Sequence, residues 1–212
     1  MGIFNIFKKK NEVSDINTNK DIVDGDIGRE LTEDEKKELI KILPTFEYHP
    51  NVYDNGIVDF KVGICDCCGK KVEAYVPTMY AMERVKCICM NCVKDGSAAK
   101  KFDGHFIEHS QKVSNPVKKD ILYHKTPGYV SWQGEYWLAC CDDYCEYIGD
   151  VGTKELDELG ITDEVINEYR EKISDSFDVD EIKDWLEAGG SFAGYLFKCK
   201  HCGKYHINID SE

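Results

Sequence analysis

Eleven cysteines, most of them in close pairs, constrain this chain more than any other feature. The stretch CDCCGK places Cys65 and Cys68 at C-x-x-C spacing with Gly69 directly after them, and CICMNC repeats the spacing with Cys89 and Cys92. Two thiolates so spaced converge on one ion from a tight turn, and the glycine permits the positive φ that such a turn needs. Two such pairs about twenty residues apart predict a four-cysteine zinc ribbon.

Two further cysteines, Cys67 and Cys87, lie within these motifs and compete for the same roles. We favour Cys89 and Cys92 as ligands because only they give a second C-x-x-C pair. Cysteines also serve as small buried hydrophobic residues, and a C-x-x-C pair can act as a redox dithiol. The first alternative explains two phased pairs poorly, and the sequence lacks the thioredoxin-like context of the second.

A second set of cysteines is divided between two distant segments. Cys199 and Cys202 form a C-x-x-C pair in CKHCGKYH, and Cys141 and Cys145 are spaced C-x-x-x-C in LACCDDYCEYIG. Neither pair has a local partner, so we predict that they combine into one four-cysteine site. Residues 146–198 would then form an insertion whose two ends are held by the ion.

The ligands of this second site have alternatives, because Cys140 can replace Cys141, and His201 or His206 can replace a cysteine. Four soft thiolates favour Zn²⁺, with iron as the main competitor. A site with four protein ligands leaves no position for a bound water. We therefore predict two structural zinc ions and no enzymatic activity.

The 212 residues, 42 % of them hydrophobic, suffice for one medium domain or two small ones. No apolar run reaches the roughly eighteen residues of a membrane helix, and the N-terminus lacks the long apolar stretch of a secretory signal. We expect a cytoplasmic protein, where reduced thiols favour metal binding over disulfides.

Residues 1–30 are predicted to form a disordered tail and linker. Its opening, MGIFNIFKKK, combines four bulky apolar residues with three lysines, a pattern that also suits weak contact with an anionic membrane surface.

Residues 31–212 are predicted to form an α+β zinc-binding domain, in which a small antiparallel-strand zinc-ribbon region is followed by a second zinc-tied lobe. Thr32 and Glu35 have capping-box spacing, which predicts a helix from about residue 33 to 42, within 31–43, ended by Pro44. Strands are expected to dominate the ribbon region, 44–110, up to about residue 90.

The second lobe is predicted to span 120–212 and to carry an acidic helical insertion. Thr153 and Thr162 can each cap a helix, and Asp178 or Asp180 can begin a third, so that helices occupy 153–188. The last apolar run, FAGYLFKC, has the residue types of a strand.

Charge is distributed unevenly along this chain, whose formal net charge is −13. Residues 150–190 hold fourteen acids and four bases, net −10, whereas 61–101 hold eight bases and four acids, net +4. An acidic surface suits a basic protein partner, although a solvated helical surface explains the same acids. The alternative function is a nucleic-acid-binding or regulatory zinc ribbon, with contacts from Lys70, Lys71, Lys100 and Lys101; the negative net charge disfavours it.

Two other stretches allow a catalytic interpretation. DGSAAKKFDG is explained more simply by a turn and a short helix capped by Ser97 and ended at Asp103 and Gly104. YVSWQGEYW carries aromatics at a spacing more typical of a core than of a pocket. If they line a groove, Gln133 and Glu135 are its polar contacts. We predict no catalytic residue.

Five stretches together resemble the CbrC family of bacterial proteins: LPTFEYHPN, CDCCGK, CVKDGSAAKKFDG, TPGYVSWQGEYWLACCDDYCEYIGDVG and FKCKHCG. The resemblance covers residues 43–205. Members are linked with colicin tolerance and lack an assigned activity, so it implies protein binding in tolerance or immunity to colicin-like toxins. It also implies ligands at eight positions and leaves Cys67, Cys87 and Cys140 outside the pattern. These eight are Cys65, Cys68, Cys89, Cys92, Cys141, Cys145, Cys199 and Cys202.

Overall fold

The computed structural model describes residues 26–172 and 178–212, so most of the predicted tail, residues 1–25, lies outside the described residues. The helices are α1 (Glu33–Ile40), α2 (Met90–Lys94), α3 (Ser97–Phe102), α4 (Pro116–Lys125), α5 (Thr153–Leu159), α6 (Thr162–Lys172) and α7 (Val179–Trp185). The strands are β1 (Gly63–Ile64), β2 (Lys71–Val72), β3 (Tyr75–Val76), β4 (Ile88–Cys89), β5 (His109–Ser110), β6 (Tyr136–Trp137), β7 (Ala139–Cys140), β8 (Asp143–Tyr144), β9 (Glu146–Val151), β10 (Phe192–Lys198) and β11 (Tyr205–Ser211).

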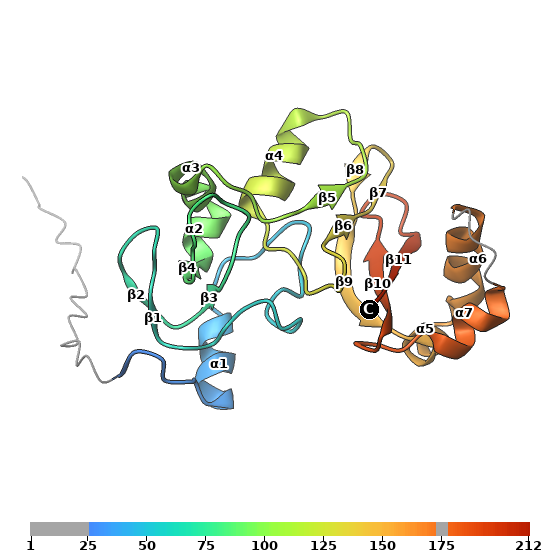
Figure 1. Ribbon diagram of the computed structural model, residues 1–212, viewed down its shortest axis with the longest axis horizontal. Coiled ribbons are helices and arrows are strands. Elements are labelled where there is room, and N and C mark those ends of the chain that lie inside the picture. Colours follow the sequence, from blue (N-terminus) through green and yellow to red (C-terminus); the bar gives the residue numbers. More distant parts are fainter. Residues whose placement is uncertain (1–25, 173–177) are drawn as a thin grey trace, which may run out of the picture.

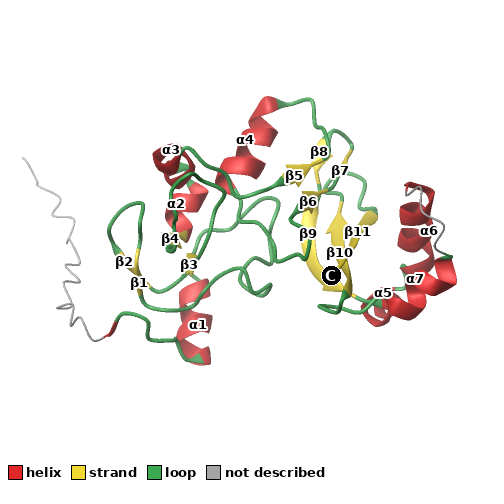
Figure 2. Cartoon of the chain, viewed as in Figure 1, coloured by secondary structure: helices red, strands yellow, loops and turns green. Residues whose placement is uncertain are grey.

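The mixture of helices and small antiparallel sheets agrees with the predicted α+β class (Figure 2). Strands β1 and β2, β3 and β4, and β7 and β8 form antiparallel pairs, whereas β5 and β6 pair in parallel. The expectation that strands dominate as far as residue 90 is wrong. Each strand of this region is two residues long, because its chain is held by tight turns and by isolated bridges such as Asp59 with Tyr75.

The largest sheet is antiparallel, has the order β11-β10-β9, and separates two hydrophobic cores. Side chains alternate between the faces of a strand. On β10, Tyr195 and Phe197 therefore belong to the main core, while Leu196 belongs to the second core. Figure 1 shows the result, with α1 to α4 on one side of the sheet and the helices α6 and α7 of the insertion on the other.

The helices of the insertion form close to where the sequence predicts them, but Thr153 and Thr162, which were expected as caps, are the first residues inside α5 and α6. Asp178 caps α7 through a capping box with Glu181. Thr153 is not a cap, because Gly152 occupies that position and the hydroxyl of Thr153 donates to the carbonyl of Lys183. Val165 of α6 is one of the apolar side chains that these helices bury against the sheet, so the insertion has a core of its own.

Two helices of the N-terminal half, α1 and α3, form where the sequence predicts them. Thr32 and Glu35 form the predicted capping box of α1. Helix α3 ends at Asp103, as expected, but Ser97 lies inside it, because Gly96 is the cap and the carboxylate of Asp95 accepts from the Ser97 amide. No helix within the described part of the chain is long and apolar enough to cross a membrane.

The aromatic stretch YVSWQGEYW divides between core and surface. Tyr129 and Trp137 are buried in the main core, where the ring of Tyr129 stacks on that of Tyr147 at 4.4 Å between centroids. Trp132 and Tyr136 are exposed. The core interpretation therefore holds for half of these rings.

Candidate metal centres

The first four-cysteine group is assembled from the turn between β1 and β2, which carries Cys65 and Cys68, and from the junction of β4 and α2, which carries Cys89 and Cys92. Cys65, Cys68, Cys89 and Cys92 bring their sulfurs within 4.8 Å of one another, as the spacing predicts. The Sγ atoms of Cys68 and Cys89 lie 3.9 Å apart. Two sulfurs bound at about 2.3 Å to a tetrahedral ion lie about 3.8 Å apart, so the group has the dimensions of a tetrahedral thiolate site.

The turn that carries Cys65 and Cys68 has a local cause. The amide of Gly69 donates to the carbonyl of Cys65 at 2.8 Å, and the amide of Cys65 donates to the carbonyl of Lys70 at 2.9 Å. Gly69 has φ of +73°, a conformation that a residue with a Cβ rarely adopts. The sequence C-x-x-C-G-K thus specifies a turn that places both sulfurs on one side.

The same turn recurs at the second group. The amide of Gly203 donates to the carbonyl of Cys199 at 3.0 Å, and the amide of Cys199 donates to the carbonyl of Lys204 at 2.8 Å. Gly203 has φ of +76°. The amide of His201 points at the Cys199 sulfur from 3.4 Å. Burial acts to raise the pKa of Cys199, but the hydrogen bonds that its sulfur receives lower it to about 6, which favours the thiolate that binds metal.

The second group consists of Cys140, Cys141, Cys199 and Cys202, again with all sulfurs within 4.8 Å of one another. The Sγ of Cys140 lies 3.7 Å from that of Cys141 and 3.6 Å from that of Cys202. A disulfide has sulfurs about 2.05 Å apart, so these are free thiols in reach of one ion. The two distant segments whose cysteines lack local partners in the sequence therefore do come together.

One member of this group differs from the predicted set. Cys140 occupies the place expected for Cys145, which is fully buried and does not belong to the group. The turn between β7 and β8 explains the difference, because Cys141 and Asp142 both have φ of +54° and form its two central residues. The turn directs the side chains of Cys140 and Cys141 toward Cys199. Burial raises the pKa of Cys145 to about 12.

Both groups have supporting residues that spacing could not indicate. Near the first, Lys101 donates to the carbonyls of Asp66 and Cys67 at 2.7 and 2.8 Å. Near the second, the buried carboxylate of Asp143 lies 2.8 Å from Nε2 of His201 and accepts from Tyr48 at 2.9 Å. Asp143 thereby links the turn that carries Cys199 and Cys202 to Tyr48 in the N-terminal half.

Two lysines complete the surroundings of Asp143. Lys118 and Lys200 lie 3.2 and 3.4 Å from its Oδ2. Burial alone would raise the pKa of Asp143, but the hydrogen bonds from His201, Tyr48 and Lys118 prevail and lower it to about 2. Asp143 therefore joins α4, the Cys199 turn and the N-terminal half beside the second group.

The other candidate ligands are engaged elsewhere. His201 faces Asp143, and Nδ1 of His206 lies 2.6 Å from Glu168. Cys87 is buried, and burial raises its pKa to about 12. Cys67 lies outside the first group, with its sulfur 3.7 Å from the hydroxyl of Ser97.

The lysines considered for phosphate contacts are partly used within the protein. Lys71 pairs with Asp26 at 3.1 Å, and Lys101 is bound to the first cysteine turn. Lys70 and Lys100 are exposed.

Comparison with known proteins places the chain in a family. Residues 43–211 match an uncharacterised protein family, UPF0167. The chain is 33 % identical to a UPF0167 protein of Pseudomonas aeruginosa over 174 residues, which cover 79 % of this chain and 97 % of the relative. It is 34 % identical to UPF0167 proteins of Mycobacterium bovis and Mycobacterium tuberculosis, with 79 % of this chain and 93 % of each relative covered. No solved structure matches. The chain therefore belongs to UPF0167, a bacterial protein family without an assigned function.

Proposed function

We propose that this protein holds two structural zinc ions and acts by binding a basic protein partner, without catalysis. The sulfur separations of 3.6, 3.7 and 3.9 Å in the two groups support the metal part, because a tetrahedral thiolate site requires about 3.8 Å. Four thiolates and no oxygen ligand favour zinc. Such sites stabilise folds, since the metal binds the folded arrangement of loops.

Elemental analysis tests the metal part. The purified chain should carry about two zinc ions, and Cys68→Ser and Cys202→Ser should each carry about one. Cys67→Ser is the matched control, because this cysteine adjoins the first group without belonging to it, and it should retain two. Iron in place of zinc, or a single ion per wild-type chain, would contradict the proposal.

The acidic surface of the insertion supports the partner part. We define the acidic face as the exposed acids of the described residues between 150 and 190. Its members are Asp150, Asp157, Glu158, Asp163, Glu164, Glu171, Asp178, Asp180, Glu181, Asp184 and Glu187. Lys183 and Lys172 pair with Asp163 and Glu168, which engages two of the four bases in the segment. The negative electrostatic field of such a face speeds encounter with a basic protein and disfavours the binding of acidic proteins.

A charge-reversal pair tests this face. Glu164→Lys with Glu171→Lys alters two exposed positions on α6 and leaves the partly buried Glu168 in place. Glu73→Lys with Glu83→Lys makes the same charge change on exposed positions outside the insertion. Affinity capture from the source cells should lose a basic partner with the first pair and keep it with the second. Equal capture by both would contradict the proposal.

The role in tolerance or immunity to colicin-like toxins is the most specific part of the proposal and rests on the CbrC resemblance of residues 43–205. Survival of a deletion strain in a toxin challenge tests it. The wild-type gene should restore survival, and the α6 charge-reversal pair should not. Unchanged sensitivity on deletion would remove this role without affecting the metal assignment.

A further inference from the structure

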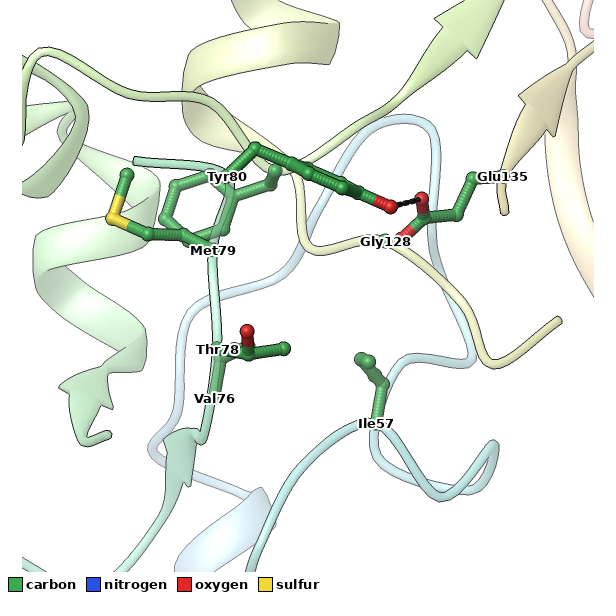
Figure 3. Close-up of a pocket in the computed structure, with 8 residues that line it drawn as sticks. Ile57, Val76, Thr78, Met79, Tyr80, Gly128 and Glu135 are labelled. Carbon is green, nitrogen blue, oxygen red and sulfur yellow. Dashed lines mark hydrogen bonds between the residues drawn. The ribbon is translucent and has the colours of Figure 1, made fainter. Parts of the chain in front are cut away.

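A small pocket lies between the loop that follows β3, the segment around Phe106 and the segment that leads into β6 (Figure 3). Its volume is about 130 Å³, and no cysteine lines it. Most of its wall is apolar, formed by Ile57, Val76, Met79 and Phe106. Exposed Thr78 and Tyr80 form its rim, so the pocket is reached from the surface.

One charged side chain lines the pocket, that of Glu135, which is only 8 % exposed. Tyr80 donates to its Oε2 at 2.6 Å, and Figure 3 shows the tyrosine hydroxyl directed at the carboxyl group. Within residues 26–172 and 178–212, no lysine, arginine or histidine forms an ion pair with Glu135. Its charge has no compensating cation in this part of the fold, and burying an uncompensated carboxylate is costly.

The carboxyl group of Glu135 is held at the pocket by its surroundings. A Cβ on Gly128 would lie 2.2 Å from Oε1 and 2.9 Å from the carbonyl of Phe106, so only glycine allows the carboxyl to pack here. Burial raises the pKa of Glu135, and the hydrogen bonds from Tyr80 and from the backbone amides of Glu135 and Glu108 oppose this only in part. Glu108, whose Oε2 lies 3.5 Å from the hydroxyl of Tyr80, adds negative charge and is itself 3.9 Å from exposed His109. The ring of His105 stacks on that of Tyr80 at 5.2 Å, with its Nδ1 at the carbonyl of Ile107 and not at Glu135.

A cation of the right size would compensate the charge of the Glu135 carboxylate and fill the pocket. An engineered cavity of about 150 Å³ holds a benzene molecule, so this pocket has room for a group of about five heavy atoms. Because Tyr80 already donates to Glu135, its oxygen still has lone pairs for an incoming donor. The apolar wall suits an alkyl chain better than a fully polar ion.

We propose that this pocket binds a compact alkylammonium group, with its N–H donors on the Glu135 carboxylate and the Tyr80 oxygen and its alkyl chain against Ile57, Val76 and Met79. Two sources share this chemistry, a free small amine and a lysine side chain of another protein. The site uses neither the metal groups nor the acidic face, so it stands independently of the proposed function.

Methyl NMR of the full-length chain as purified tests the proposal. The probe is n-butylammonium, with n-butanol as its uncharged counterpart, and the reporters are the methyl groups of Ile57 and Met79. We expect saturable shifts with butylammonium and at least tenfold weaker binding of butanol. N-acetyl-lysine methylamide in the same titration separates the sources: tighter binding than butylammonium indicates a lysine side chain, and weaker binding indicates a free amine.

Two variants and a control complete the test. Glu135→Gln removes the charge but keeps an acceptor for Tyr80, and Ile57→Phe fills the pocket but keeps the charge. Each should weaken butylammonium binding at least tenfold, while Glu83→Gln, at an exposed acid outside the pocket, should bind within twofold of wild type. Thermal unfolding of each variant confirms that it is folded. Equal binding of butylammonium and butanol, or undiminished binding by folded Glu135→Gln, would overturn the proposal.

Discussion

The sulfurs of Cys140 and Cys202 lie 3.6 Å apart, although 62 positions separate the two residues in the chain. Between them lie β9, the helical insertion and β10, so this contact closes the base of the insertion. The sulfur of Cys145 does not join the group. The structure thereby offers five cysteines for four coordination positions in this half of the molecule.

Substituting Cys140 and Cys145 separately shows which of the two is the fourth ligand of the second group. Cys140→Ser should reduce the metal content from about two ions per chain to about one, because it removes a sulfur from the group. Cys145→Ser should keep both ions and lower the free energy of unfolding by about 1 kcal/mol, as expected for a polar hydroxyl in a buried site. Elemental analysis and urea unfolding measure the two effects. Metal loss in Cys145→Ser and not in Cys140→Ser would restore the ligand set expected from spacing.

The contrast between these two cysteines shows what local sequence can and cannot predict. C-x-x-C-G-K appears twice, and both copies form the expected turn, because the glycine conformation and the hydrogen bonds of this turn are local. The choice of Cys140 depends on a turn in which Cys141 and Asp142 both have positive φ. Asp142 tolerates this conformation, but Cys141 rarely adopts it and neither residue is glycine, so the sequence signals this turn only weakly.

Long-range partners were equally beyond the reach of sequence patterns. Tyr48 donates to Asp143 across 95 positions, and Tyr80 donates to Glu135 across 55. Such contacts arise only when the main core forms, and single residues without a repeated spacing indicate none of them. Capping signals, in contrast, lie within four residues. The sequence therefore predicts the cap of α1 and narrows that of α7 to Asp178 or Asp180, of which the structure selects Asp178.

The network around Asp143 should control metal retention at the second group. Asp143→Asn removes the charge that faces Lys118, Lys200 and His201. Loss of a carboxylate that hydrogen-bonds a metal ligand lowers metal affinity by about 10- to 100-fold. Asp143 contacts His201, which lies between two of the cysteines and not in the group, so we expect a loss at the lower end of this range. Competition with a chromophoric chelator at neutral pH should therefore show one weakened metal and one unchanged. Asp184→Asn, at an exposed position, is the control and should retain both; equal retention in the two variants would exclude the supporting role.

Glu135 should make stability depend on pH. Burial raises its pKa in the folded protein above the ordinary value of 4.5, so folding favours the protonated acid, and its contribution is lost as pH rises through the folded pKa. Glu135→Gln should match wild type below about pH 4.5 and should have the higher free energy of unfolding at about pH 8. Urea unfolding at both pH values measures this. A variant less stable than wild type at the higher pH would show that the charge is compensated in the fold.

The contact between His206 and Glu168 should hold α6 on the sheet. Nδ1 of His206 on β11 lies 2.6 Å from the Glu168 carboxylate, while its buried Nε2 has no hydrogen-bond partner within the described ranges. Glu168→Ala leaves both ring nitrogens without a partner, which costs about 1 to 3 kcal/mol. Because α6 belongs to the second core, the loss should appear as faster amide exchange in α6 and not in α4. Glu171→Ala removes an exposed acid from the same helix and should leave exchange unchanged, so equal acceleration by both variants would show that helix propensity or net charge, and not this contact, sets the stability of α6.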